Sequence, residues 1–209
     1  MSSTESMASN VFTKFQFTAA NPQPVREIKR SRDIGSNTGV PIRYRAEWDR
    51  TDTNDEWAAN HAKILSKMNS GGIIAVIGNR GTGKTRISAE VMRDYSPVRG
   101  DYITAMGLFL RIRASFNSKG ETEDQIVNEV SRAKMLIIDE VQERGNTPWE
   151  DRILTHILDR RYADMRPTII IANLTESALT ECLGESIVSR LFETGGILEM
   201  NGKSHRTGK

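Results

Sequence analysis

The strongest constraint on the fold is the stretch GNRGTGKT at residues 78–85. It has the spacing G-x-x-x-x-G-K-[ST] and follows the apolar run IIAVI at residues 73–77. In a phosphate-binding loop the glycines let the backbone curl, so that several N–H groups point at the phosphates. A helix that starts at the end of the loop directs its positive end at the same anion. The stretch therefore predicts a strand–loop–helix unit that binds a nucleoside triphosphate, rather than a glycine-rich turn that binds nothing.

The residues of this loop have separate roles in binding. Lys84 would approach the β- and γ-phosphates, and the Thr85 hydroxyl would bind Mg²⁺. We expect ATP as the nucleotide and Mg²⁺ as the ion. The full set of expected nucleotide contacts is Gly78, Asn79, Arg80, Gly81, Thr82, Gly83, Lys84 and Thr85.

A second stretch, KMLIIDE at residues 134–140, supplies the acids that hydrolysis needs. Asp139 follows an apolar run and can hold Mg²⁺ together with Thr85, directly or through water. The adjacent Glu140 can orient and polarise the attacking water. Asn173 follows the apolar run PTIII and can reach the γ-phosphate. In isolation the acid pair could cap a helix and the asparagine could form a turn, but the loop upstream favours an ATPase site.

Apolar runs alternate with helical patterns along the chain. The expected strands are residues 73–77, 101–104, 134–138, 167–171 and 196–200. The expected helices between them are residues 84–95, 105–117, 121–132, 149–165, 175–182 and 184–193. A further helix is expected before the first strand, capped by Asn54 or Thr53 and ended by Gly71 and Gly72. Strands that alternate with helices predict an α/β fold, a parallel sheet with helices on both faces.

Composition fits one ATPase domain. The chain has 209 residues and a net charge of +2, so its overall charge predicts no class of partner. Cys182 is the only cysteine, which excludes a disulfide within the chain and favours a reducing compartment. The sequence has no apolar run of membrane-spanning length, and MSSTESMASN lacks the apolar core of a signal peptide. We therefore expect a cytoplasmic protein without a membrane partner.

Three regions are expected along the chain. Residues 1–24 are rich in Ser, Thr, Asn and Gln, which is typical of poorly ordered segments. The stretch VFTKFQF within them could dock on a partner or be an irregular tail. Residues 25–53 form a basic lead-in, which is either a solvated surface or a phosphate contact. Residues 54–209 form the expected ATPase domain.

Several blocks beyond the phosphate loop resemble one family. They are RSRDIGSNTGVP, FLRIRASFNSKGETEDQIVNEV, MLIIDE, ILDRRYADMRPTIIIANLT, LGESIVSRL and SHRTGK. In this order and spacing the chain resembles the AAA+ domain of DnaC-type bacterial replicative helicase loaders, which are relatives of the IstB transposition ATPases. The resemblance covers residues 26–209 and implies the AAA+ P-loop fold with the sheet order 5-1-4-3-2.

The resemblance also implies catalytic roles. Asn173 would be the sensor 1 residue, Arg190 an arginine finger that acts on a neighbouring subunit's nucleotide, and Arg206 a sensor-2-like arginine. Together with Lys84 and Glu140 they make up the expected catalytic set. Positive charge from an arginine finger stabilises the developing charge on the γ-phosphate.

In the resembling family, a helix pair after the second strand lines a DNA-binding surface. Here Arg111 and Arg113 would contact the phosphates of single-stranded DNA, and Phe116 would stack on its bases. Helical spacing offers a second interpretation, in which these helices present only core residues. That interpretation is favoured for Phe109 and Ile112 and stays open for Phe116.

The expected function is therefore an ATPase with weak hydrolysis, which self-associates through its ATP sites and loads a hexameric replicative helicase onto single-stranded DNA. Two alternatives stay open. The chain could be the partner ATPase of a transposase, as in the IstB relatives. It could also be a regulatory decoy that blocks a helicase or its loader and uses ATP as a structural ligand. Glu140 and Arg190 argue against a purely structural nucleotide.

Overall fold

Within the described residues, 39–46, 54–95, 100–116 and 120–202, the computed structural model contains one sheet of five parallel strands. The strands are β1 (Ile73–Ile77), β2 (Asp101–Thr104), β3 (Leu136–Asp139), β4 (Thr168–Ile171) and β5 (Gly196–Glu199). Their order is β2-β3-β4-β1-β5, which is the order 5-1-4-3-2 read from the opposite edge. The predicted sheet and its strand order are confirmed.

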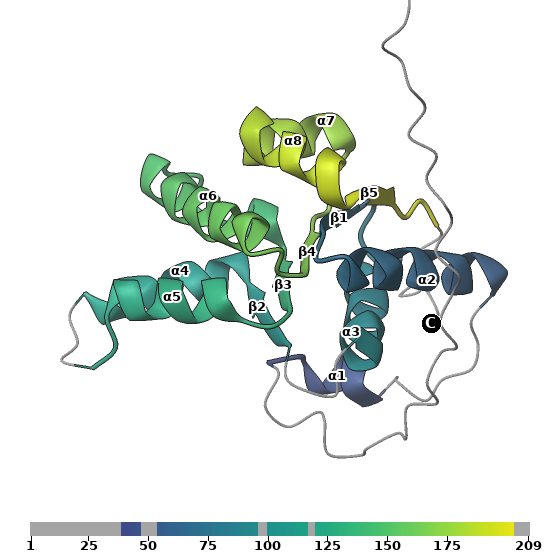
Figure 1. Ribbon diagram of the computed structural model, residues 1–209, viewed down its shortest axis with the longest axis horizontal. Helices are drawn as coiled ribbons and strands as arrows, with labels where there is room; N and C mark the ends of the chain where they lie inside the picture. The colour runs from purple at the N-terminus through teal and green to yellow at the C-terminus, as the bar shows by residue number, and fades with distance from the viewer. Residues whose placement is uncertain (1–38, 47–53, 96–99, 117–119, 203–209) are drawn as a thin grey trace, which may run out of the picture.

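Helices cover both faces of the sheet (Figure 1). One face carries α1 (Ile42–Ala46), α2 (Asp55–Asn69) and α3 (Lys84–Tyr95). The other carries α4 (Ala105–Ser115), α5 (Glu123–Arg132), α6 (Pro148–Ala163), α7 (Glu176–Leu183) and α8 (Glu185–Thr194). A short 3-10 helix, η1 (Val141–Glu143), follows β3.

The alternation of side chains along the central strand β1 divides the interior into two cores. Ile73, Ala75 and Ile77 pack with residues of α4 to α8, whereas Ile74 and Val76 pack with residues of α2 and α3. Successive side chains of a strand point to opposite faces, so a strand covered on both sides must be apolar throughout. This requirement explains the uninterrupted run IIAVI before the loop.

Side-chain caps fix where the helices begin. The Asn54 side chain accepts a hydrogen bond from the Trp57 backbone N–H at 2.9 Å, which makes Asn54 the cap of α2. Thr122 and Thr147 begin α5 and α6 with reciprocal capping boxes, to Gln125 and Glu150 respectively. Such caps satisfy backbone donors that have no partner inside the helix.

The structure adds two short elements to those that the sequence predicts. Helix α1 lies inside the basic lead-in, and Val40 beside it is buried against the α2–α3 face. Helix η1 occupies the turn after Asp139. Residues 1–38 and 203–209, which include VFTKFQF and Arg206, lie outside the described residues. Among the described helices, none is both long enough and apolar enough to cross a membrane.

Candidate nucleotide-binding and hydrolysis site

The predicted phosphate loop connects β1 to the N-terminus of α3, as expected. Gly78, Gly81 and Gly83 have φ angles of 126°, 87° and 94°, which side-chain-bearing residues rarely adopt. At Gly78 an added Cβ would also lie 2.4 Å from the carbonyl oxygen of Met200. The loop glycines therefore serve both the left-handed turns of the loop and its close contact with the chain after β5.

Lys84 lies inside this loop, with only 4% of its surface exposed. Its Nζ donates to the carbonyl oxygens of Gly78 at 2.8 Å and Asn79 at 2.6 Å. These contacts hold a buried ammonium group at the N-terminal end of α3, where the helix dipole adds to its positive charge. The arrangement is suited to a phosphate anion, the ligand predicted from the sequence.

Thr85 and Asp139, the predicted metal ligands, are in direct contact. Thr85 Oγ1 donates to Asp139 Oδ2 at 2.8 Å and so joins the start of α3 to the end of β3. Mg²⁺ binds oxygen donors and takes few of them from protein, with phosphates and waters supplying the rest. A hydroxyl and a carboxylate that meet beside a phosphate loop fit this ion.

A tyrosine that the sequence interpretation missed also contacts Asp139. Tyr102 on β2 donates its phenol hydrogen to Asp139 Oδ2 at 2.7 Å. Burial raises the pKa of Tyr102 above its ordinary value, and the charge and hydrogen bond of Asp139 raise it further. The phenol is therefore a hydrogen-bond donor at neutral pH.

Glu140 lies directly beyond β3, at the surface, in a left-handed conformation with φ 53° and ψ 46°. Its backbone N–H donates to Asp139 Oδ1 at 2.7 Å. The left-handed region costs a residue with a side chain about 1 kcal/mol, and such strain is concentrated at functional positions. The conformation turns the chain from β3 into η1 and leaves the Glu140 carboxylate exposed, as a residue that handles water requires.

Asn173 and Glu140 come from the ends of adjacent strands and are connected through η1. The Asn173 backbone N–H donates to Gln142 Oε1 at 3.2 Å, and Gln142 Nε2 donates to Glu143 Oε1 at 3.3 Å. Glu143 in turn pairs with Arg80 of the phosphate loop at 3.0 Å. Gln142 and Glu143 were not predicted as site residues, although they stand two and three positions after Glu140.

Arg80 was predicted as a nucleotide contact, and its side chain is 74% exposed in the pair with Glu143. A surface pair of this kind contributes little stability, because both groups stay hydrated. It does link the phosphate loop with the turn after β3. Whether Arg80 contacts the nucleotide stays a prediction.

The predicted arginine finger, Arg190, lies on α8, and within the described residues its side chain contacts groups on α6 and α8. Its Nη1 donates to the Ser186 carbonyl oxygen at 2.8 Å, and its Nη2 lies 3.3 Å from Asp159 Oδ1. Its guanidinium carbon lies 5.4 Å from the centre of the Tyr162 ring. The structure thus does not join Arg190 to the phosphate loop of its own chain. Its predicted role on a neighbour's nucleotide stays a prediction.

The predicted DNA contacts lie on and just after α4. Arg111 is paired with Glu121 and with Glu129, the latter at 2.6 Å. Arg113 is paired at 2.7 Å with Glu150, whose side chain is buried. Phe116 is 58% exposed, so it does not belong to the core, and its ring meets the Trp149 ring edge-on at 5.8 Å between centroids. Its exposure leaves it available for stacking.

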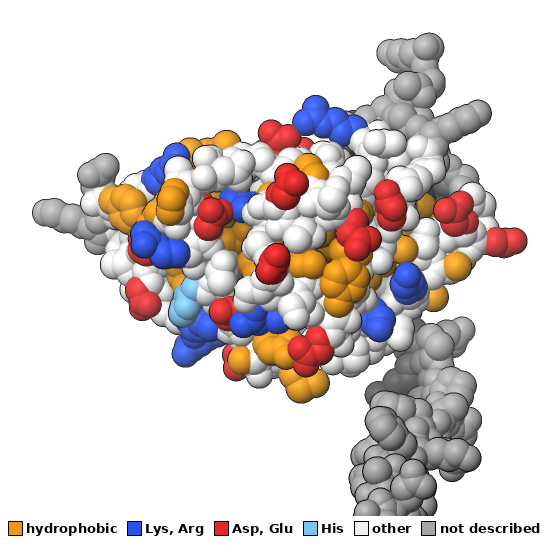
Figure 2. Space-filling model, turned by 90° about the horizontal axis from the view of Figure 1, so that it is seen from above, with side chains coloured by type: hydrophobic (Ala, Val, Ile, Leu, Met, Phe, Trp, Pro, Cys, Tyr) orange, Lys and Arg blue, Asp and Glu red, His pale blue; other side chains and the backbone are white. Residues whose placement is uncertain are grey.

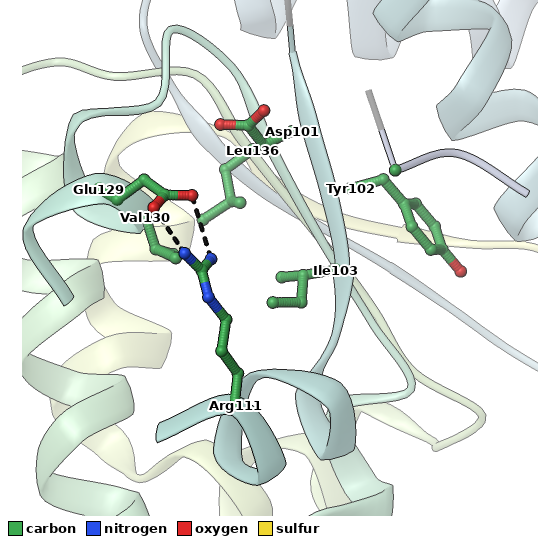
Figure 3. Close-up of a pocket in the computed structure, with 8 residues that line it drawn as sticks. Asp101, Tyr102, Ile103, Arg111, Glu129, Val130 and Leu136 are labelled. Carbon is green, nitrogen blue, oxygen red and sulfur yellow. Dashed lines mark hydrogen bonds and ion pairs between the residues drawn. The ribbon is translucent and has the colours of Figure 1, made fainter. Parts of the chain in front are cut away.

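The pocket drawn in Figure 3 is not the nucleotide site. It lies beside β2, α4 and α5 and is lined by residues that include Asp101, Ile103, Arg111 and Glu129. Its volume of about 150 Å³ is below the roughly 300–1,000 Å³ of small-molecule sites. A phosphate loop needs no deep cavity, because backbone groups surround the phosphates. We assign no ligand to this pocket.

Figure 2 shows the molecule from above the view of Figure 1, on the side of α6, α7 and α8. Acidic and basic side chains are interspersed with hydrophobic ones across this face. Large hydrophobic side chains that are exposed in the described structure are Ile42, Met106, Leu110, Phe116, Met165 and Phe192. Three of them lie on or next to α4, which is the helix expected to contact DNA.

Comparisons with solved structures show the fold. The crystal structure of the DnaC helicase loader has a TM-score of 0.65 at 20% identity, covering 77% of this chain and 100% of that one. A structure of the replication initiator DnaA bound to AMPPCP and single-stranded DNA has a TM-score of 0.62 at 19% identity, covering 77% and 50%. These likenesses confirm the predicted fold, a five-stranded parallel sheet with helices on both faces.

Comparisons of sequence show the family. The replicative helicase loader DnaC of Escherichia coli K12 is 30% identical over 117 residues, 54% of this chain and 47% of the relative. The uncharacterized protein YdaV of the same strain is 29% identical over 180 residues, 82% of this chain and 71% of the relative. The chain thus spans about half the length of the DnaC relatives that it matches. A family model described as IstB-like ATP binding protein matches residues 46–209, and the chain belongs to this family.

Proposed function

We propose that this protein is an ATPase that binds a hexameric replicative helicase and delivers it to single-stranded DNA. The observation that carries the ATPase part is the contact between Thr85 Oγ1 and Asp139 Oδ2, at 2.8 Å, beside the buried Lys84. This contact joins the phosphate loop to the end of β3, which is followed directly by Glu140. The helicase part is supported by the identity to DnaC, a replicative helicase loader, over 54% of this chain.

Each residue of the site has a role in this proposal. Lys84 would neutralise phosphate charge, and Thr85 and Asp139 would hold Mg²⁺, which when bound would offset the charge of the phosphate oxygens. Glu140 orients the attacking water. Asn173 lies beyond the end of β4, the strand between β1 and β3, and its backbone is tied to η1 by Gln142. Loss of the γ-phosphate would therefore change the contacts of residues at the ends of three strands, β1, β3 and β4.

The DNA contact is proposed for the exposed end of α4. Phe116 presents an aromatic surface, and Arg113 lies one turn before it with 49% of its side chain exposed. Aromatic stacking combined with a nearby cation is the common arrangement for single strands. Arg111 can take part only if its pairs with Glu121 and Glu129 open, and Arg113 only if its pair with Glu150 opens. We therefore expect Phe116 to contribute more than either arginine.

A second candidate function is that of a partner ATPase for a transposase. It is favoured by the match to the IstB-like family model over residues 46–209. The ATP chemistry would be the same, and only the protein partner would differ. A helicase loader and a transposase partner would both work at DNA, so we propose the cytoplasm as the location of the protein in either case.

The test uses purified full-length protein and two substitutions. Lys84→Ala should abolish ATP binding, whereas Glu140→Gln should keep binding and lose turnover, because only the water-handling group is changed. A turnover in Glu140→Gln equal to that of the wild type would contradict the site assignment. The matched control is Glu181→Gln, which changes an exposed acid on α7 that has no place in the site.

The partner is tested by co-purification with a replicative helicase, with and without ATP, followed by a loading assay on DNA coated with single-strand-binding protein. We expect capture of the helicase and ATP-dependent loading. Capture that only inhibits loading would favour the decoy alternative. Failure to bind the helicase, together with binding to a transposase, would favour the second candidate function.

A further inference from the structure

We infer that Tyr102 is a positioning residue, which fixes the Asp139 carboxylate for Mg²⁺ and so sets how much Mg²⁺ the site needs to bind nucleotide. The inference rests on the proposed ATPase function, because it assigns Asp139 to the metal. It adds a residue from β2, an edge strand that otherwise contributes nothing to the predicted site.

The register of the sheet explains how Tyr102 reaches Asp139. In the β2–β3 pairing, Tyr102 is opposite Ile137 and Thr104 is opposite Asp139. Tyr102 is thus the diagonal neighbour of Asp139, two positions back on the same face of the sheet. A diagonal neighbour is beyond the reach of a short side chain, but the length of a tyrosine places its hydroxyl 2.7 Å from Asp139 Oδ2.

In the described structure, donors from three directions hold the Asp139 carboxylate. Oδ2 accepts from Thr85 on α3 and from Tyr102 on β2, and Oδ1 accepts from the backbone N–H of Glu140. Together the contacts to both oxygens prevent rotation of the carboxylate. Loss of a hydrogen bond that orients a ligating group typically lowers metal affinity by about 10–100-fold.

The Tyr102 bond differs from the other two in its source. Thr85 is itself a predicted metal ligand, and the Glu140 donor is the backbone N–H of the residue next to Asp139. Tyr102 is the side-chain donor that comes from neither the phosphate loop nor the turn after β3. It can therefore hold the carboxylate in one orientation when the phosphate loop changes conformation.

Tyr102 is in turn held on both sides of its strand. Its backbone pairs with β3 on one side, and on the other Gly39 approaches so closely that an added Cβ would lie 2.4 Å from the Tyr102 carbonyl oxygen. The ring packs against the α2–α3 core. Figure 3 shows the ring on the opposite side of β2 from Arg111 and Glu129. The phenol thus lies on the face of the sheet that carries α2 and α3, where it meets Asp139.

The experiment compares Tyr102→Phe with wild-type protein of full length. A fluorescent ATP analogue is titrated at increasing Mg²⁺ and also in EDTA, and urea unfolding is measured on the same samples. We expect the Mg²⁺ concentration at half-maximal binding to rise by about tenfold, the lower end of the effect of such supporting residues. Binding in EDTA should not change. Tyr95→Phe, a change to another partly buried tyrosine against the same core, is the matched control.

The outcomes separate the inference from the proposed function. A Mg²⁺ midpoint within twofold of the wild type would overturn the role of Tyr102. Equal weakening of binding with Mg²⁺ and in EDTA would show a merely structural role and would also overturn it. Asp139→Asn tests the metal site itself, because an unchanged Mg²⁺ midpoint in that variant would contradict the proposed ATPase site instead. Mn²⁺ binding followed by electron paramagnetic resonance gives a second readout that does not depend on the nucleotide probe.

Discussion

Arg161 on α6 is a buried cation whose replacement should destabilise the whole sheet. It is 0% exposed. Within the described chain its guanidinium donates to acceptors on three segments: the end of α5, the lead-in to β3 and the lead-in to β4. These acceptors are Thr168 Oγ1 and the carbonyl oxygens of Val130, Ser131, Ala133 and Pro167, at distances of 2.7–3.1 Å. The arginine thus sets β3 and β4 side by side at the ends opposite Asp139 and Asn173.

The size of the effect follows from these contacts. Hydrogen bonds from a charged donor contribute about 1.5–3 kcal/mol each, and five of them are offset by the several kcal/mol needed to bury the cation. Burial, and then the charge of Arg166, lower the pKa of Arg161 to about 9, so the cation persists at pH 7. Arg161→Met removes every donor and leaves buried carbonyl oxygens without them. We expect a loss of about 4 kcal/mol of unfolding free energy, out of the 5–15 kcal/mol typical of a domain.

The assay is urea unfolding followed by circular dichroism, with Arg152→Met, at an exposed position of the same helix, as the control. Arg161→Lys should lose about 2 kcal/mol, because an ammonium has three donors and cannot reach all the segments. A loss below about 1 kcal/mol in Arg161→Met, at an unchanged m-value, would refute the reasoning, since it would mean that the acceptors find other donors.

Three further predictions concern the interface, the DNA and pH. Mixing Arg190→Ala with Lys84→Ala protein should restore part of the ATPase activity, and no recovery between folded proteins that associate would contradict an arginine finger acting in trans. Phe116→Leu should weaken single-stranded DNA binding by about 1–3 kcal/mol in a fluorescence anisotropy titration without altering stability; unchanged affinity would exclude stacking. Burial raises the pKa of Asp94, but hydrogen bonds from His61 and then Arg93 outweigh it and lower the pKa from 3.8 to about 2. The stability that Asp94 contributes is therefore present above pH 4 and is lost as the pH falls toward 2. After allowance for the partial exposure of Asp94, the unfolding free energy of Asp94→Asn should be about 1 kcal/mol below that of the wild type at pH 7 and equal to it near pH 2. A constant difference in unfolding free energy across this range would contradict the assignment.

Much of the fold could be predicted because the strands are short, apolar on both faces and separated by capped helices. The five predicted strands agree with the structure to within two residues at each end. The helical spacing that assigned Phe109 and Ile112 to the core is confirmed by exposures of 1% and 0%. Strand order was available from the family resemblance, because periodicity alone does not specify which strands are neighbours.

The contacts that complete the site could not be predicted in the same way. Tyr102 reaches Asp139 only because of the register between β2 and β3, and a shift of one residue would turn it to the other face. Gln142 meets Asn173 only because Glu140 adopts a left-handed conformation that turns the chain into η1. Arginine on an amphipathic helix is usually a surface residue, so the burial of Arg161 likewise depends on the tertiary structure.

The contacts of Arg190 bear on how hydrolysis and self-association would be coupled. In the single chain its guanidinium is held by the Ser186 carbonyl group, by Asp159 and by the Tyr162 ring, and its side chain is 27% exposed. Partly exposed contacts of these kinds are each worth about 0.5–1 kcal/mol, so leaving them costs about 2 kcal/mol. Charge-assisted hydrogen bonds to a phosphate would return about 1.5–3 kcal/mol each. Without a neighbour's γ-phosphate, Arg190 would therefore keep the contacts within its own chain. With that phosphate present, it would exchange them for hydrogen bonds to the phosphate. If Arg190 acts on a neighbour's nucleotide as proposed, this gain would be lost on hydrolysis, and the assembled state would depend on ATP through the contacts of one side chain.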